Sequence, residues 1–160
     1  MIKKLFNACL IGLLVFPGGC VKGSAKEAAA LGREASHLMQ EEKYNEAIIL
    51  VEKAEKLDPK NFSYSIGLAF AYNKTGQFEK AKSKYLEILP KLREAASKDD
   101  SKVIEVILVL MSLRKQGEAQ NELEKARERF GEKEIYDSIE EQILNDPNYF
   151  EDFVLPKEYL

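Results

Sequence analysis

A chain of 160 residues, 45% hydrophobic and 32% charged, has the size and composition of one globular domain rather than of a disordered protein. Its net charge of −3 excludes the strongly basic surface typical of nucleic-acid-binding domains. One histidine and two cysteines cannot fill a zinc site of about four Cys and His ligands, and the composition indicates no cofactor and no catalysis.

The first twenty residues have the layout of a targeting signal. Lys3 and Lys4 precede the uncharged, mostly apolar stretch 5–16, which is shorter than the roughly 20 residues of a spanning helix. Two glycines then precede Cys20. This layout resembles a bacterial lipoprotein signal peptide, which implies removal of residues 1–19 and attachment of acyl chains, palmitate among them, at Cys20. An ordinary secretory signal or anchor, with Cys20 incidental, is the alternative.

Lipidation would determine where the protein resides. Residues 20–25 would be a short tether that holds the domain 26–145 close to the bilayer. Val21 is not the Asp that retains lipoproteins in the inner membrane of enteric bacteria. The resemblance therefore implies the periplasmic face of the outer membrane if the cell has one, and otherwise the outer leaflet of the cytoplasmic membrane.

A repeat of 34 residues follows. Residues 44–48, Tyr-Asn-Glu-Ala-Ile, return as residues 78–82, Phe-Glu-Lys-Ala-Lys. Each copy predicts two amphipathic helices, and Ala47 and Ala81 leave room for these helices to approach closely. The expected core-facing residues are Leu31, Ala35, Leu38, Ala47, Val51, Ala54, Leu68, Ala69, Tyr72, Ala81, Tyr85 and Ile88.

At these residues the chain resembles the tetratricopeptide repeat family, whose fold is an all-α, right-handed solenoid of antiparallel helix pairs. The repeats would span about 28–61 and 62–95. Glu34 and Ser65 replace large apolar residues of the family pattern, and Pro90 should kink or end the last helix. Helical hairpins that match by chance are the alternative.

The carboxyl third predicts a less regular continuation. Ser101 should cap a buried helix over 103–111, and residues 116–117, Gln-Gly, should turn the chain into a second helix. We interpret the helix pair 101–130 as a degenerate third repeat and residues 132–145 as a capping helix. The aromatic, acidic tail 146–160 either folds back onto the end of the solenoid or docks on a partner or on a second copy of the chain.

Few residues are candidates for chemistry. His37 is the only histidine, and the sequence shows no nucleophile motif that would partner it. The adjacent acids Glu41-Glu42 and Glu140-Glu141 point about 100° apart on a helix, which favours solvated faces over a shared proton. Asp99-Asp100 is better explained by helix capping than by a metal site. The sequence therefore predicts a protein that is not an enzyme.

The family resemblance implies a binding groove. In tetratricopeptide repeats the first helices of successive repeats line a concave groove for peptides. The lysine and asparagine that grip a partner's terminal carboxylate in some members are replaced here by Gly32 and Ser36. The alternative is that the candidate residues pack against the third repeat. The candidate groove residues are Arg33, Ser36, Gln40, Ile66, Phe70, Asn73 and Lys74.

These expectations combine into one hypothesis: a membrane-anchored scaffold or assembly factor of the bacterial cell envelope that binds a protein or peptide. Two alternatives stay open, a permanent structural subunit of an envelope complex and a non-catalytic regulator of a cell-wall enzyme. Nucleic acid is not an expected partner.

Overall fold

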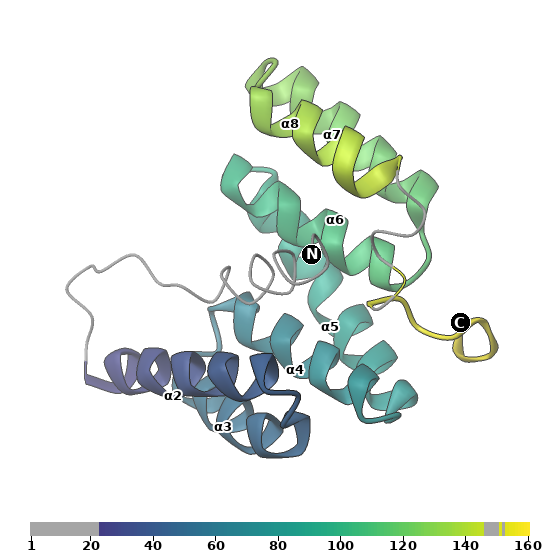
Figure 1. Ribbon diagram of the computed structural model, residues 1–160. Helices are drawn as coiled ribbons and strands as arrows, with labels where there is room; N and C mark the ends of the chain where they lie inside the picture. The colour runs from purple at the N-terminus through teal and green to yellow at the C-terminus, as the bar shows by residue number, and fades with distance from the viewer. Residues whose placement is uncertain (1–22, 146–150, 152) are drawn as a thin grey trace. The chain divides into compact units, whose positions relative to one another are not determined.

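The structure, a computed structural model, describes residues 23–145, 151 and 153–160 (Figure 1). The expected signal peptide 1–19 and the expected lipidation site Cys20 lie outside the described residues. Every element of the described part is a helix, and the helices follow one another in pairs, which confirms the all-α prediction. The chain forms two compact units, an N-terminal unit, Met1–Lys84, and a C-terminal unit, Tyr85–Leu160. The right-handed course predicted for the solenoid stays a prediction.

Small residues bring the helices of the N-terminal unit together. The unit contains α2 (Gly23–Gln40), α3 (Tyr44–Leu57), α4 (Phe62–Lys74) and the start of α5 (Phe78–Ala96). Helix α3 packs against both α2 and α4. Ala35, Ala47 and Ala81 are fully buried, as the repeat pattern predicts. A methyl group at such positions lets two helix backbones approach closely while neighbouring larger side chains fill the space beside them.

The first helix begins earlier than the sequence suggests. Residues 20–25 were expected to form a tether, but α2 starts at Gly23. Ser24 and Ala25 continue directly into the amphipathic sequence, and neither residue breaks a helix. The prediction that the helical domain starts at residue 26 is therefore wrong by three residues.

The turns inside the helix pairs share one backbone geometry. Glu42, Gly76 and Arg114 have φ angles of 60°, 74° and 55°, in the left-handed region. In each turn, the N–H of the following residue donates to the carbonyl five residues earlier, at 2.8 Å, as in a Schellman motif. Gly76 adopts this conformation without strain, whereas Glu42 and Arg114 carry a Cβ that disfavours it.

The C-terminal unit continues the helix pairs. After the rest of α5 come a 3₁₀ turn, η1 (Asp100–Lys102), then α6 (Val103–Ser112) and α7 (Gln116–Phe130), which pack together. A short helix, α8 (Glu134–Ile139), runs into a π-helical turn, η2 (Glu140–Leu144), and η2 packs on α7. The third pair and the capping element are thus present. The side chain of Ile143 lies outside the described part.

Three local predictions in this unit need correction. Helix α5 runs through Pro90, which is exposed, so of the two expected effects of Pro90, a kink or an end of the helix, the end is wrong. The turn lies at Leu113–Lys115 rather than at residues 116–117, because Arg114 takes the left-handed conformation. Ser101 does not cap α6, which is preceded by Lys102 without a side-chain capping bond; Asp99 caps the 3₁₀ turn before it, where its Oδ1 accepts the Ser101 N–H at 3.0 Å.

Candidate functional site

The seven candidate groove residues differ in how much surface they present. On α2, Arg33 and Gln40 are exposed, whereas Ser36 is buried. On α4, Lys74 is partly exposed. The three remaining residues are 8%, 2% and 8% exposed, namely Ile66, Phe70 and Asn73. The accessible part of the expected groove is therefore cationic and polar rather than aromatic, and peptide binding at these positions stays a prediction.

Phe70 is a core residue of the N-terminal unit. Its ring meets the Tyr44 ring edge to face, with centroids 6.0 Å apart and planes at 77°. The Lys74 Nζ lies 5.7 Å from the centre of the same ring, within cation–π range. Phe70 thus links the start of α3 to α4 and orients Lys74, so truncating it would change stability as well as any binding surface.

Polar side chains from three helices meet at Ser65, one of the positions where the sequence departs from the family pattern. The Ser65 hydroxyl donates to the carboxylate of Glu55, and the Lys84 Nζ lies 3.3 Å from both oxygens of that carboxylate. Ser65 is only 6% exposed, and the side chains of Glu55 and Lys84 are about one-fifth exposed. The serine noted as a departure from the family pattern therefore reaches a carboxylate on α3 instead of filling apolar space.

A second contact of this kind lies one turn away on α3. The Tyr72 hydroxyl donates to Glu52 Oε1 at 2.7 Å, and the Lys80 Nζ lies 5.3 Å from the centre of the Tyr72 ring. Burial first, and then the Glu52 carboxylate, raise the pKa of Tyr72 to about 12. Residues 52 and 55 were not singled out by sequence reasoning, although their spacing of three places them on one face of the helix.

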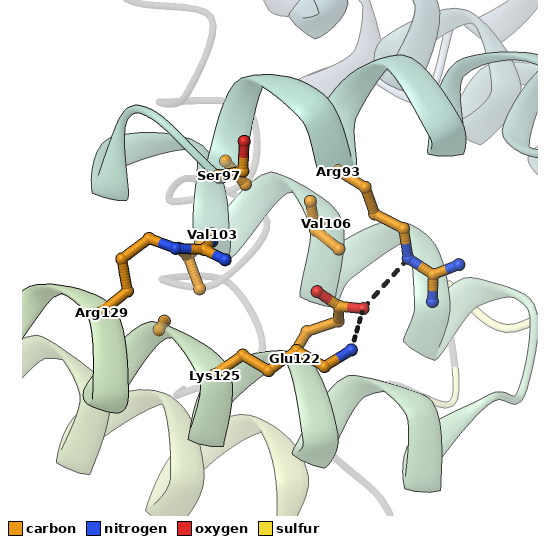
Figure 2. A pocket seen from close by; sticks show the side chains of 9 residues that line it. Arg93, Ser97, Val103, Val106, Glu122, Lys125 and Arg129 are labelled. Carbon is orange, nitrogen blue, oxygen red and sulfur yellow. Dashed lines mark hydrogen bonds and ion pairs between the residues drawn. The ribbon is translucent and has the colours of Figure 1, made fainter.

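The C-terminal unit contains a small cavity among α5, α6 and α7 (Figure 2). Arg93 Nε lies 3.1 Å from Glu122 Oε1, which the Lys125 Nζ also approaches at 3.3 Å. The Arg93 Nε–H is not aligned as a hydrogen-bond donor to that oxygen. The cavity holds about 20 Å³, which is room for about one water molecule. The charged side chains of Arg93, Glu122 and Lys125 therefore link α5 to α7.

One carboxylate lies inside the apolar helix α6. Glu105 is 4% exposed, and its Oε1 lies 2.8 Å from the Lys102 Nζ. Within the described part of the chain its Oε2 is buried and has no hydrogen-bond partner. Burial of a half-satisfied carboxylate normally opposes folding, so Lys102 is the contact that makes this position tolerable.

The end of the chain lies on its own C-terminal unit. Phe153 is 4% exposed and Leu155 is fully buried. The Leu155 N–H donates to the Ser112 carbonyl at 2.9 Å, and the Arg114 Nε donates to the Leu155 carbonyl at 2.8 Å. Of the two interpretations that the sequence left open for the tail, the structure favours folding back. Residues 146–150 lie outside the described part.

The remaining residues that were considered for catalysis or metal binding take part in ion pairs. His37 is exposed, and its Nδ1 lies 3.6 Å from Oε1 of Glu41, four residues further along the chain and just beyond the end of α2. The Lys43 ammonium, which pairs with Glu41 at 2.8 Å, lowers the pKa of that carboxyl. Asp100 pairs with Lys133, and Glu140 with Arg127. The described residues contain no group of three or more His, Cys, Asp or Glu side chains that could hold a metal ion. Among them, too, no helix combines the length and apolarity needed to cross a membrane.

The comparison with known proteins gives a match only within the helix pairs. A family model described as tetratricopeptide repeat matches residues 38–99, from the end of α2 through α5. Searches of curated proteins and of solved structures give no significant match. Residues 38–99 thus match the tetratricopeptide repeat model, and repeats of this kind suggest a protein–protein interaction module.

Proposed function

We propose that this chain is a lipid-anchored protein-binding module of the bacterial cell envelope. The family match over residues 38–99 carries the binding half of the proposal. The charged, apolar and small-residue segments that end at Cys20 support the anchor. More than one acyl chain would give stable membrane attachment, and the module would then hold a soluble or membrane partner near the bilayer.

The surface available for a partner on the N-terminal unit is the polar side of the expected groove. Arg33 and Gln40 are exposed on α2, and Lys74 is partly exposed on α4. Two cations among three such residues favour a partner segment that carries acidic or polar side chains. A module that holds such a segment would act as the scaffold or assembly factor expected from the sequence.

The anchor and the binding activity have separate tests. Mass spectrometry of the mature amino-terminal peptide should find acylated Cys20, and a Cys20→Ala variant should leave the membrane fraction of intact cells. Crosslinking in the same cells should then recover a protein partner with the wild-type chain. A free Cys20 thiol, or cleavage at another position, would contradict the anchor, and absence of any specific crosslink would contradict the binding module.

A further inference from the structure

The cavity among α5, α6 and α7 combines an apolar lining with charged side chains. All of its lining residues belong to the C-terminal unit. Four of them are buried and apolar, namely Ala96, Val103, Val106 and Ala126. Four others are charged, namely Arg93, Glu122, Lys125 and Arg129. Charges next to an apolar, poorly hydrated surface attract an opposite charge more strongly than the same charges do in water.

The cations of this lining outnumber its carboxylate three to one. Glu122 Oε1 is approached by both Arg93 Nε and Lys125 Nζ, at 3.1 and 3.3 Å, so two cations already share its charge. Arg93 also pairs with Glu118 at 2.8 Å. Among the residues that the structure describes, no carboxylate pairs with Arg129, whose Cζ lies 6.0 Å from the centre of the Phe130 ring. The positive charge of Arg129 is therefore left without a counter-charge.

The side chain of Arg129 reaches over the cavity. Figure 2 shows its guanidinium turned toward Val103, with Glu122 and Arg93 on the opposite side. Arg129 lies in the last turn of α7, where any cation is favourable because it compensates the helix dipole. The dipole alone does not explain a guanidinium that lines a cavity next to a surplus of positive charge.

A second hydrogen-bond donor of the cavity is also unsatisfied. The Arg93 Nε is buried and has no hydrogen-bond acceptor in the described part of the chain. A buried donor without an acceptor opposes folding, so an incoming acceptor would relieve this cost. The unpaired guanidinium of Arg129 and the unsatisfied Nε–H of Arg93 thus both point to a ligand with negatively charged oxygen atoms.

The size of the cavity favours a carboxylate. A volume of about 20 Å³ holds one water-sized group, which suits one oxygen of a flat carboxylate better than a tetrahedral phosphate. Arginine binds carboxylates through two parallel hydrogen bonds. The buried alanine and valine side chains of the lining offer apolar contact to the methylene groups that carry the carboxylate in aspartate and glutamate.

We propose that this cavity binds an aspartate or glutamate side chain of a protein partner, with the Arg129 guanidinium as its main donor. The proposal rests on the proposed function as a protein-binding module and adds a second contact site, in the C-terminal unit, with its own ligand chemistry. Glu122 limits the affinity of this site, because its carboxylate already occupies Arg93 and Lys125.

The test titrates the full chain with acetyl-glutamate-amide, a glutamate residue blocked at both ends, at constant ionic strength. Nuclear magnetic resonance follows the Nε–H signals of Arg93 and Arg129. The probe should shift both signals until they saturate. Acetyl-glutamine-amide has nearly the same shape without the charge and should bind at least about tenfold more weakly, since the charged hydrogen bonds are lost. Equal binding of the two probes would overturn the proposal.

Two substitutions should change binding of the glutamate probe in opposite directions. Arg129→Gln should weaken it about tenfold, whereas Glu122→Gln should tighten it, because the competing carboxylate is removed. Lys157→Gln is the matched control: it removes one positive charge at an exposed position of the same unit, outside the cavity, and should change nothing. Equal weakening by Arg129→Gln and Lys157→Gln would mean general attraction and would contradict a site at the cavity.

Competition experiments identify the class of ligand. Inorganic phosphate, or vesicles that contain anionic lipid, should displace the glutamate probe no better than acetate does at equal ionic strength. Stronger displacement by either would overturn the proposal, because a phosphate group would then be the occupant. Since Arg129 is exposed, its replacement should leave the urea unfolding midpoint unchanged, and this measurement separates lost binding from misfolding. None of these measurements depends on Cys20 or on capture in cells, so failure here leaves the proposed function to its own tests.

Discussion

At the scale of single residues, buried alanines determine how closely the helices of the N-terminal unit pack. Ala47 and Ala81 are both fully buried. Leucine at either position adds three carbon atoms where neighbouring atoms already touch, and such overpacking costs about 1–3 kcal/mol. We expect Ala47→Leu and Ala81→Leu each to lower the free energy of unfolding by that amount, measured by urea titration.

The exposed Ala30 provides the control for this prediction. It lies on α2, outside the packed interface. Ala30→Leu should leave the unfolding midpoint nearly unchanged. Equal effects of all three substitutions would show that leucine acts through helix propensity or solubility rather than through packing.

Tyr85 links stability to alkaline pH. It is fully buried in the C-terminal unit, and burial raises the pKa of its hydroxyl to about 12. In the unfolded chain the pKa is about 10, so the unfolded state loses this proton first. The stability that Tyr85 contributes in its neutral form is therefore complete below about pH 10 and is lost as the pH rises from about 10 to about 12.

Tyr85→Phe removes this titration. Relative to the variant, the wild type should lose about 1.4 kcal/mol between pH 8 and pH 11, which follows from the two pKa values. Urea titrations of both proteins across this range measure the difference. Parallel pH profiles would mean that the hydroxyl titrates equally in the folded and unfolded states.

Phe70 shows where residue-level reasoning from the sequence failed. Its position between two core-facing residues suggested an accessible aromatic anchor, but it is 2% exposed. Amphipathic periodicity separates the two sides of a helix, yet α4 is buried almost all round, so its sequence contains no exposed stripe that would mark a groove. Phe70→Ala should cost about 3–5 kcal/mol, and a loss of binding in that variant could not be assigned to the groove.

At the scale of elements, backbone conformation predicts opposite effects on stability when two glycines, one in a left-handed turn and one in a helix, are replaced by alanine. Gly76 has a φ of 74°, whereas Gly117 lies within the first turn of α7 without a positive φ. A Cβ added at either position meets no atom within 4 Å, so only the backbone conformation distinguishes them. Gly76→Ala should destabilise the protein by about 1–2 kcal/mol. Gly117→Ala should stabilise it by about 0.5–1 kcal/mol.

Thermal melting measures both substitutions, and each serves as the control for the other. Substitutions of the same sign would contradict the assignment of the turn to residues 113–115. The sequence favoured residues 116–117 for this turn because glycine is the usual signal, and an arginine with positive φ carries no signal of its own.

Helix pairing was predictable because it rests on repeated apolar spacing. The 34-residue recurrence placed Ala47 and Ala81 at equivalent buried positions. The path through Pro90 and the cap at Asp99 depended instead on local solvent exposure and on side-chain geometry. The hydrogen bond from Arg114 to the Leu155 carbonyl joins residues 41 positions apart, and no repeat or motif connects them in the sequence.

At the scale of the whole molecule, charge is the property by which the proposed partner surface of the N-terminal unit would select its partner. Arg33 is exposed and Lys74 is partly exposed, so the proposed groove surface attracts acidic segments. Reversing both charges, Arg33→Glu with Lys74→Glu, should weaken partner capture about tenfold at low salt and much less at high salt, because exposed charges are screened. Crosslinking yields in intact cells, followed by binding at two salt concentrations in vitro, measure this.

The matched control for the charge reversal is Lys53→Glu with Lys56→Glu, two exposed lysines of α3 that lie outside the proposed groove. This control changes the net charge by the same amount, so an equal loss of capture would indicate general attraction rather than a groove. If the Arg33 and Lys74 variant still captures the partner while Leu155→Asp abolishes capture, binding runs through the carboxyl-terminal tail rather than through the groove. The acidic character expected of the partner would then no longer follow from the groove.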